Sequence, residues 1–231
     1  MKPAPPLKEL VSVSELLRRR LKETERTPEE LAEHIELPPE YVKDLLSGKR
    51  RPPLPGRTDI YEKMTRFLGL GRTDLASCAT AERAETKKAN TGPEAPVRKA
   101  LLDICNPETA KELERRAKKN PEELIDFMQR VLDVAQAGVR RMLDDPISLR
   151  LAATKNGSEF IPMRLRVLEF LDVTIATLTM QDLSNWVLPR ISRWDVDLST
   201  GVLRVILRTQ EAPEQNRRRP TIGGRRGRLG S

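Results

Sequence analysis

Apolar side chains recur three and four residues apart along the start of the chain, which is the spacing of an α-helix. The first stripe predicts a helix from Leu7 to about Glu25, with Ser12 or Ser14 as the cap of its regular part. Arginine and lysine surround this stripe, whose members are Leu10, Val13, Leu16, Leu17 and Leu21. The pattern is that of an amphipathic helix.

The stretch 27–49, TPEELAEHIELPPEYVKDLLSGK, predicts two short helices joined by a tight turn. Thr27 is suited to cap the first of them, because Pro28 then takes the first helical position and Glu30 completes a capping box. The apolar side of this helix consists of Leu31, Ala32 and Ile35.

Residues 36–37 form the turn, and two prolines at 38–39 begin the second of these helices. It is expected to end at Ser47-Gly48, since glycine suits a left-handed C-terminal cap. Prolines exclude a helix in the next segment, 49–56 (KRRPPLPG), which is predicted to be an extended basic loop. A further amphipathic helix, capped by Thr58, follows this loop.

The segment 71–96 is polar and poor in large apolar side chains, so it is predicted to be a linker with a short helical piece around 76–88. Helices resume near Val97 and restart at two Asn-Pro steps, at 106–107 and 120–121. From the second step onward a long apolar stripe predicts a helix suited to packing or to dimerisation.

The pattern changes again after residue 146, where β-structure is expected. A hairpin with an Asn-Gly turn is predicted over 147–167, and a second hairpin with a Ser-Thr-Gly turn over 194–207. Between them, 168–180 fits either a strand or a helix, and 181–190 fits a short helix with Trp186 on its apolar side. The fold class expected from all elements is mostly α, with a smaller α+β part at the C-terminal end that contains β-hairpins.

Composition and charge narrow the class of protein. An apolar content of 38% with only 3% aromatic residues suits helices with small cores better than a β-sandwich or a large α/β enzyme. The net charge of +8 is unevenly spread, because the stretch from Arg217 to the end carries six arginines and no acid, while the rest is nearly neutral. This tail is expected either to add non-specific affinity for nucleic-acid phosphate or to be an unstructured, solubilising end.

Several functions are not expected from the residues present. No apolar run approaches the roughly 20 residues that span a membrane, and the start lacks an apolar signal core. Cys78 and Cys105 lie far apart without a CxxC partner, so neither a metal site nor a disulfide framework is expected, and a cytoplasmic location fits. With His34 as the only histidine and no phosphate-binding loop, we expect no enzyme and no cofactor.

Four short segments together suggest a known kind of domain: Leu31-Ala32, 37–42 (LPPEYV), 46–49 (LSGK) and 68–70 (LGL). In this order the helices of residues 8–70 resemble the lambda-repressor-like, Cro/XRE-type helix-turn-helix family. The resemblance covers about a quarter of the chain. It implies a compact domain of four to five helices that binds DNA as a dimer, with the helix from Pro38 in the major groove.

The resemblance also implies which side chains would meet DNA. By position, the bases would face Pro39, Glu40, Tyr41 and Asp44, while cations near the end of the helix would supply positive charge for the phosphates. Members of the family often carry glutamine near the start of the scanning helix, where this chain has Pro28. The candidate DNA-binding residues are Thr27, Pro39, Glu40, Tyr41, Lys43, Asp44, Lys49, Arg50 and Arg51.

The expected organisation follows from these observations: a helix-turn-helix domain over 8–70, a linker over 71–96, a helical and possible dimerisation segment over 97–145, an α+β region over 146–210 and a disordered arginine-rich tail over 211–231. The first functional hypothesis is a sequence-specific transcriptional regulator that binds double-stranded DNA as a homodimer. Because the expected DNA-facing helices carry many carboxylates, a second hypothesis is a protein-interaction adaptor or antitoxin-like partner. A third is a non-specific nucleic-acid binder that acts through the tail.

Overall fold

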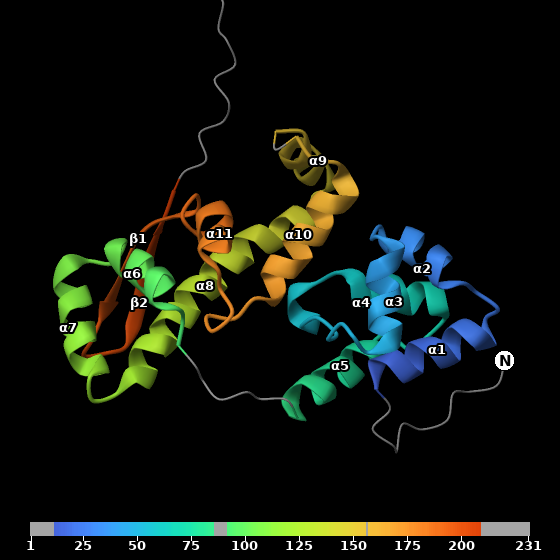
Figure 1. The fold of residues 1–231 in the computed structure, drawn as a ribbon, viewed down its shortest axis with the longest axis horizontal. Helices are drawn as coiled ribbons and strands as arrows, with labels where there is room; N and C mark the ends of the chain where they lie inside the picture. Colours follow the sequence, from blue (N-terminus) through green and yellow to red (C-terminus); the bar gives the residue numbers. More distant parts are fainter. Residues whose placement is uncertain (1–11, 86–91, 156, 209–231) are drawn as a thin grey trace, which may run out of the picture.

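The computed structural model describes residues 12–85, 92–155 and 157–208. Helices dominate this part of the chain, and a two-stranded antiparallel sheet lies near its C-terminal end (Figure 1). The prediction of a mostly α chain with a smaller β-containing part is therefore confirmed. The expected arginine-rich tail lies outside the described residues.

Five helices form the N-terminal group: α1 (Val13–Glu23), α2 (Pro28–Ile35), α3 (Pro39–Ser47), α4 (Ile60–Leu68) and α5 (Asp74–Glu85). Their apolar stripes meet in one core, because each stripe follows the helical period and so points to one side. The completely buried side chains of this core include Leu17, Leu31, Ile35, Val42, Ile60, Leu68 and Leu75.

The predicted helix ends are present in this group. Ser12 caps α1, and the hydroxyl of Thr27 accepts a hydrogen bond from the Glu30 N–H at 3.2 Å, while the Glu30 carboxylate accepts one from the Thr27 N–H at 2.8 Å. Gly48 ends α3 with a φ of 74°, a left-handed conformation that glycine adopts without steric cost. For α4 the cap position belongs to Asp59, although the Thr58 hydroxyl accepts a hydrogen bond from the Ile60 N–H at 3.2 Å.

Residues 74–85 form α5, which agrees with the short helical piece expected around 76–88, although this helix is part of the N-terminal core and not of a separate linker. This helix packs against α1 and α4 and completely buries Leu75 and Ala79. Its low apolar content led to the prediction of a linker, but two apolar residues four positions apart are enough to anchor a short helix on an existing core. Residues 86–91 of the expected linker lie outside the described residues.

The middle of the chain contains α6 (Ala95–Asp103), α7 (Pro107–Ala117) and α8 (Pro121–Asp144), and the last two begin at the predicted Asn-Pro steps. The 24-residue helix α8 runs through the centre of this half of the molecule (Figure 1). Its apolar stripe is buried within the chain, against α7 and against four later segments, which are α9 (Pro146–Lys155), α10 (Phe160–Asp172), the turn η2 (Leu183–Val187) and β2 (Val202–Leu207). The buried stripe therefore serves packing within the chain.

The hairpin predicted over 147–167 is wrong, because this segment forms α9 (Pro146–Lys155) and most of α10 (Phe160–Asp172). The buried residues of α10 follow a helical period rather than alternation, as Met163, Arg164, Val167, Leu168 and Leu171 show. Gly157 turns the chain between the two helices with a φ of 61°. Asn156, the other half of the expected turn, lies outside the described residues.

The second predicted hairpin is present as β1 (Ile191–Asp197) and β2 (Val202–Leu207). Before it come α11 (Met180–Asp182) and a π-helical turn, η2 (Leu183–Val187), which together confirm the expected short helix. Trp186 lies on the apolar side as predicted and stacks on Phe170, with 5.5 Å between the ring centroids. The N-terminal group and the hairpin thus lie at opposite ends of the molecule, with α8 and α10 between them (Figure 1).

Candidate nucleic-acid interface

The exposed side of α2 and α3, here called the α2–α3 face, comprises Glu29, Glu30, Glu33, Pro39, Glu40, Lys43 and Asp44. Pro39, Glu40 and Lys43 are exposed, as expected for residues that meet DNA, and Asp44 is half-buried. Lys43 is the only cation of α3, and its ammonium lies 2.9 Å from the Glu29 carboxylate. The face is therefore acidic.

Tyr41 does not lie on this face, which corrects the expectation that it faces bases. Its side chain is buried with those of Val42 and Leu45, because these three positions make up the apolar side of α3. The Arg50 guanidinium lies over the ring, 4.8 Å from its centroid. Burial raises the pKa of the Tyr41 phenol, so this side chain belongs to the core.

The start of α2, where helix-turn-helix domains often contact a phosphate, is occupied by the chain's own carboxylates. Thr27 is exposed, but its hydroxyl and N–H are both used in the capping box with Glu30. The hydrogen bond from Lys43 lowers the pKa of Glu29, and the hydrogen bond from the Thr27 backbone lowers that of Glu30. Both carboxylates therefore remain ionised at neutral pH, beside the backbone N–H groups that would otherwise attract an anion.

The basic loop after α3 reaches toward α10. Lys49 is exposed, whereas the Arg50 guanidinium lies 3.3 Å from the Glu169 carboxylate of α10. Arg51 donates to the carbonyl of Arg83 at 3.4 Å. Of the three loop cations, Lys49 thus faces solvent and the two arginines also contact other parts of the chain.

Further ion pairs hold the N-terminal group against α8 and α10. Arg57, at the end of the loop, donates to Asp133 of α8 at 2.7 Å and to the side chain of Gln136. Arg83 of α5 lies 2.7 Å from the Asp172 carboxylate at the end of α10. The loop that was expected to carry phosphate contacts is therefore also the main junction between the two halves of the described chain.

The most buried of these pairs joins Arg164 of α10 to Asp59 at the start of α4. One guanidinium nitrogen donates to both Asp59 oxygens, at 2.9 and 2.7 Å, and another donates to the Ile35 carbonyl at 3.2 Å. Sequence reasoning missed this pair, although a signal was present. With a helical period over 160–172, Arg164 takes an apolar position between Met163 and Val167. Because an unpaired buried charge is costly, an arginine at such a position is expected to pair with an acidic side chain.

Two arginines of α1 donate hydrogen bonds to the C-terminal carbonyls of other helices. Arg18 donates to the carbonyl of Leu46 at the end of α3, at 2.7 Å, and Arg20 donates to the carbonyls of Leu68 and Gly69 at 3.0 and 2.7 Å. Side chains in this role satisfy carbonyls that have no partner inside their own helix. The basic side of α1 therefore has a structural explanation.

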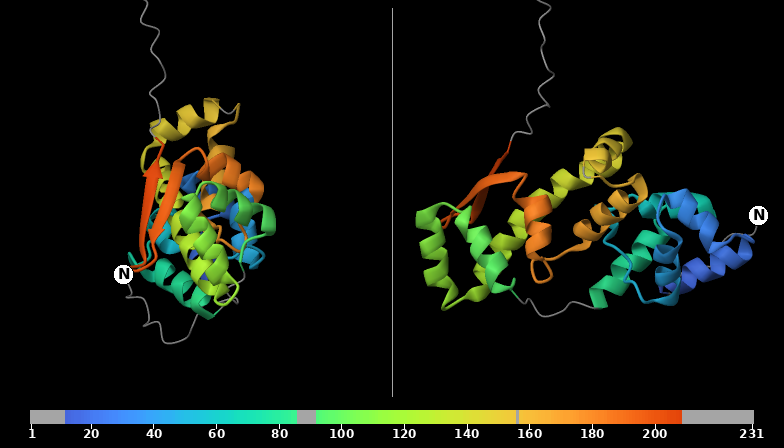
Figure 2. Two further views of the ribbon diagram at one scale, coloured as in Figure 1. Left: turned by 90° about the vertical axis from the view of Figure 1, so that its left-hand side faces the viewer. Right: turned by 45° about the horizontal axis from the view of Figure 1, so that its top comes forward.

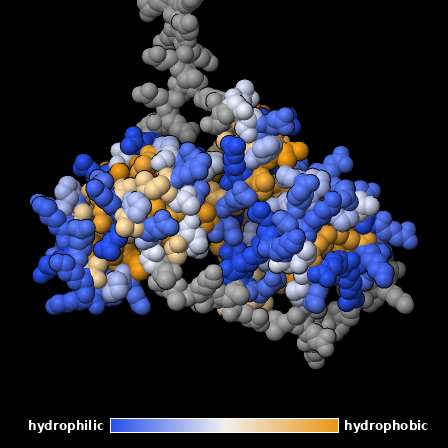
Figure 3. Space-filling model, in the orientation of Figure 1, coloured by the Kyte–Doolittle hydropathy of each residue, from blue (hydrophilic) through white to orange (hydrophobic). Residues whose placement is uncertain are grey.

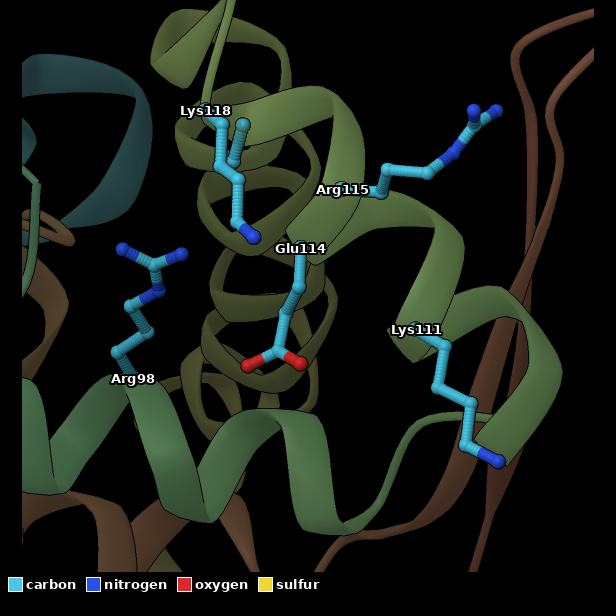
Figure 4. A pocket seen from close by; sticks show the side chains of 6 residues that line it. Arg98, Lys111, Glu114, Arg115 and Lys118 are labelled. Carbon is cyan, nitrogen blue, oxygen red and sulfur yellow. The ribbon is translucent and has the colours of Figure 1, made fainter.

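A second group of cations surrounds an open hollow of about 530 Å³ between α6 and α7. In Figure 4 the side chains of Arg98, from α6, and of Glu114 and Lys118 extend into the space between the two helices, while those of Lys111 and Arg115 extend to its other side. Nearby, Glu112 accepts hydrogen bonds from Arg115 and Arg116, which lower its pKa to about 2. Acids and bases alternate here, as on a solvated helix face.

The other candidate reactive groups have ordinary surroundings. Cys78 is half-buried and Cys105 buried, both are free thiols, and burial raises the pKa of Cys105 to about 12. Among the described residues, no cluster of His, Cys, Asp or Glu side chains can hold a metal ion. The same residues contain no helix with the length and apolar character needed to cross a membrane.

The chain matches no family model, no curated protein and no solved structure. The resemblance of residues 8–70 to the Cro/XRE-type family therefore stays a prediction that rests on their sequence.

Proposed function

We propose that the chain is a non-enzymatic, sequence-specific DNA-binding regulator that acts as a dimer through α2 and α3. The observation that carries the proposal is the α2–turn–α3 unit, in which α3 exposes Pro39, Glu40 and Lys43 while its other side is fixed in a closed core. A helix held in this way can enter a major groove without rearrangement.

The acidity of the α2–α3 face limits which bases it can meet. Carboxylates repel phosphate, but Glu40 and Asp44 can accept hydrogen bonds from the N4 amino group of cytosine. Phosphate contacts would come from Lys49, Arg50 and Arg51. The pair between Arg50 and Glu169 is partly exposed, and such pairs contribute about 0–1 kcal/mol, so Arg50 can exchange Glu169 for a phosphate at little cost.

Reversing two loop charges, with Lys49→Glu and Arg50→Glu together, is expected to abolish specific binding. If both cations contact phosphate, the non-specific binding that remains at low salt should show a slope of log K against log salt that is smaller by about 2, because each lost contact releases roughly one fewer counterion. The measurement is footprinting and gel shift on DNA upstream of the chain's own gene, at several salt concentrations. Lys118→Glu with Lys119→Glu, on the far side of the molecule, changes the charge equally and should leave the slope unaltered. Absence of any protection at low salt by folded wild-type protein would refute the proposal.

A second candidate function is favoured by the acidity itself. The exposed carboxylates of Glu29, Glu30, Glu33 and Glu40 would suit the basic surface of a protein partner, as in an adaptor or an antitoxin-like protein. A stoichiometric partner that co-purifies with a chain that protects no DNA would support this candidate.

Changing two of these acids separates the two candidates. With Glu33→Lys and Glu40→Lys together, non-specific DNA binding at low salt should strengthen, because repulsion from phosphate is replaced by attraction, while protection of the specific site should weaken, because Glu40 no longer accepts from cytosine. Binding to a basic protein partner should instead weaken, since like charges are then brought together. Gel shift and co-purification with the same variant give opposite outcomes for the two candidates. Deleting residues 217–231 should leave either activity in place, and would remove binding only if the tail alone binds nucleic acid.

A further inference from the structure

The outer edge of β2 carries backbone groups that have no partner among the described residues. β1 lies between β2, with which it pairs on one side, and residues 104–106, with which it pairs on the other. On that second side the Trp194 N–H donates to the Ile104 carbonyl at 3.0 Å, and the Asn106 N–H donates to the Trp194 carbonyl at 2.9 Å. Figure 2 shows β2 at the rim of the molecule, with no other element along its outer side.

The hydrogen bonds of Trp194 identify which groups of β2 point outward. Trp194 is opposite Val205, and its N–H and C=O both point away from β2, so these two residues are a non-hydrogen-bonded pair. The N–H and C=O of Val205 therefore point away from β1. Because the direction alternates along a strand, Leu203 and Leu207 share it, and the Arg208 N–H points inward to the Arg190 carbonyl at 2.7 Å.

This edge is unusually apolar and unprotected. β2 has the sequence VLRVIL, without the lysine or proline that commonly blocks edge pairing, and the bulge of this hairpin lies in β1. Val202, Ile206 and Leu207 are all more than half exposed. The face shown in Figure 3 mixes apolar and hydrophilic side chains over both halves of the molecule, and β2 lies on the opposite side, as the turned view in Figure 2 shows.

We propose that β2 pairs antiparallel with β2 of a second copy of the chain, with the two-fold axis at Val205. The outward groups belong to residues 203, 205 and 207, so a symmetric antiparallel ladder with more than one hydrogen-bonded pair has its axis at residue 204, 205 or 206. An axis at residue 204 sets Arg204 opposite the partner's Arg204, and an axis at residue 206 sets Arg204 opposite the partner's Arg208. Like charges directly opposite one another destabilise a sheet.

The axis at Val205 avoids both conflicts. It sets Val205 opposite the partner's Val205 and Leu203 opposite the partner's Leu207, so aliphatic side chains meet on one face of the joined sheet. On the other face, Arg204 meets the partner's Ile206. The surface is thus complementary to itself, which favours a second copy as its occupant. The inference rests on the dimer of the proposed function, and it places the dimer interface on β2 rather than on α8.

Opposite charges at residue 206 test the pairing and its register. Ile206 is 59% exposed, so its replacement removes little packing, but within its own hairpin it lies opposite Arg193, so the thermal unfolding of each variant must be compared before association is. Ile206→Arg sets the introduced arginine against the partner's Arg204 at two symmetric positions, and Ile206→Glu sets a carboxylate there. In sedimentation velocity of the full chain without DNA, the dissociation constants of the dimers of the two variants should differ by about tenfold or more, and the arginine variant should form the weaker dimer.

A second substitution tests whether Ile206→Arg weakens the dimer through the strand pairing or through a folding defect. Adding Arg204→Glu to the Ile206→Arg chain restores opposite charges across the axis, so the dimer should return, although the introduced glutamate then faces Asp195 within its own hairpin. Leu151→Arg, at an exposed apolar position on α9, should leave the dimer unchanged. Circular dichroism and thermal unfolding report whether each variant is folded.

Three outcomes would overturn the inference: a monomeric wild-type chain, equal association of the two Ile206 variants, or loss of the dimer in Leu151→Arg alone. A monomer that still protects DNA would refute this pairing and leave DNA binding in place. A dimer that responds to these changes but protects no DNA would refute the proposed function alone.

Discussion

Replacing Asp59 by alanine should destabilise the protein by about 3–5 kcal/mol, because it leaves the buried guanidinium of Arg164 without its counter-charge. The Arg164 side chain is only 2% exposed, so water cannot take the place of the lost carboxylate. The groups left near it are the Ile35 carbonyl at 3.2 Å and the Glu36 carboxylate at 3.9 Å. The free energy of unfolding, from urea denaturation at neutral pH, measures the loss.

Replacing Arg164 should lower the free energy of unfolding by less than replacing Asp59 does. This difference would show that the main cost of Asp59→Ala is the unpaired buried charge and not the lost contact. Arg164→Met leaves the carboxylate of Asp59, whose side chain is 20% exposed and has Lys63 within 3.5 Å, so we expect about 1–3 kcal/mol. The double variant Asp59→Ala with Arg164→Met should recover much of the stability, because no buried charge then remains unpaired.

A matched control lies on the same helix. Glu62 of α4 pairs with Arg66 at 3.0 Å on the surface, and Glu62→Ala should change the free energy of unfolding by no more than about 1 kcal/mol. If Asp59→Ala cost no more than Glu62→Ala, the pair with Arg164 would have no special role in joining α10 to the N-terminal group.

The N-terminal helices were predictable because their signals are local. The capping box of Thr27 and Glu30 and the glycine that ends α3 each act within one turn, so a single stretch of sequence contains the whole cause. The hairpin over 147–167 was predicted wrongly for the opposite reason. Short apolar runs fit a strand or a helix, and the choice depends on what they contact, here α8 and, through the hydrogen bonds of Arg164, Asp59 and the Ile35 carbonyl.

The site was predictable only in part, for a similar reason. The exposure of Pro39, Glu40 and Lys43 follows from their place in α3, whereas Tyr41 was assigned by analogy and belongs to the apolar side of the same helix. The partner of Arg50, Glu169, is 119 residues away in sequence. Ion pairs over such a separation depend on the tertiary arrangement, which neither the period nor the charge pattern contains.

Trp194→Ala is expected to be the other most damaging substitution, with a loss of about 3–5 kcal/mol in the free energy of unfolding. The Trp194 side chain is completely buried, and its indole N–H donates to the Leu101 carbonyl of α6 at 2.8 Å. Its backbone also pairs with residues 104–106, which follow α6. Trp194 therefore holds the hairpin against α6 through its side chain and against the segment after α6 through its backbone. Removing the ring creates a large cavity and frees a buried carbonyl.

Phenylalanine separates these two effects. Trp194→Phe keeps much of the apolar volume but leaves the Leu101 carbonyl without its donor, which should cost about 1–3 kcal/mol on top of the lost packing. Trp186→Phe is the control, because Trp186 is also buried and its ring stacks on Phe170, so this change should cost less. Equal losses in urea denaturation would mean that the hydrogen bond to Leu101 contributes nothing.

The same residue connects stability to the proposed dimer. If β2 provides the pairing edge, Trp194→Ala should weaken association in sedimentation velocity by more than Trp186→Phe does, because it loosens the strand, β1, that holds β2 in place. The core of α1 to α5 does not include Trp194, so DNA protection by that group should survive at temperatures where it remains folded. Loss of the dimer together with retention of monomeric DNA contacts would therefore place the two activities at opposite ends of the molecule.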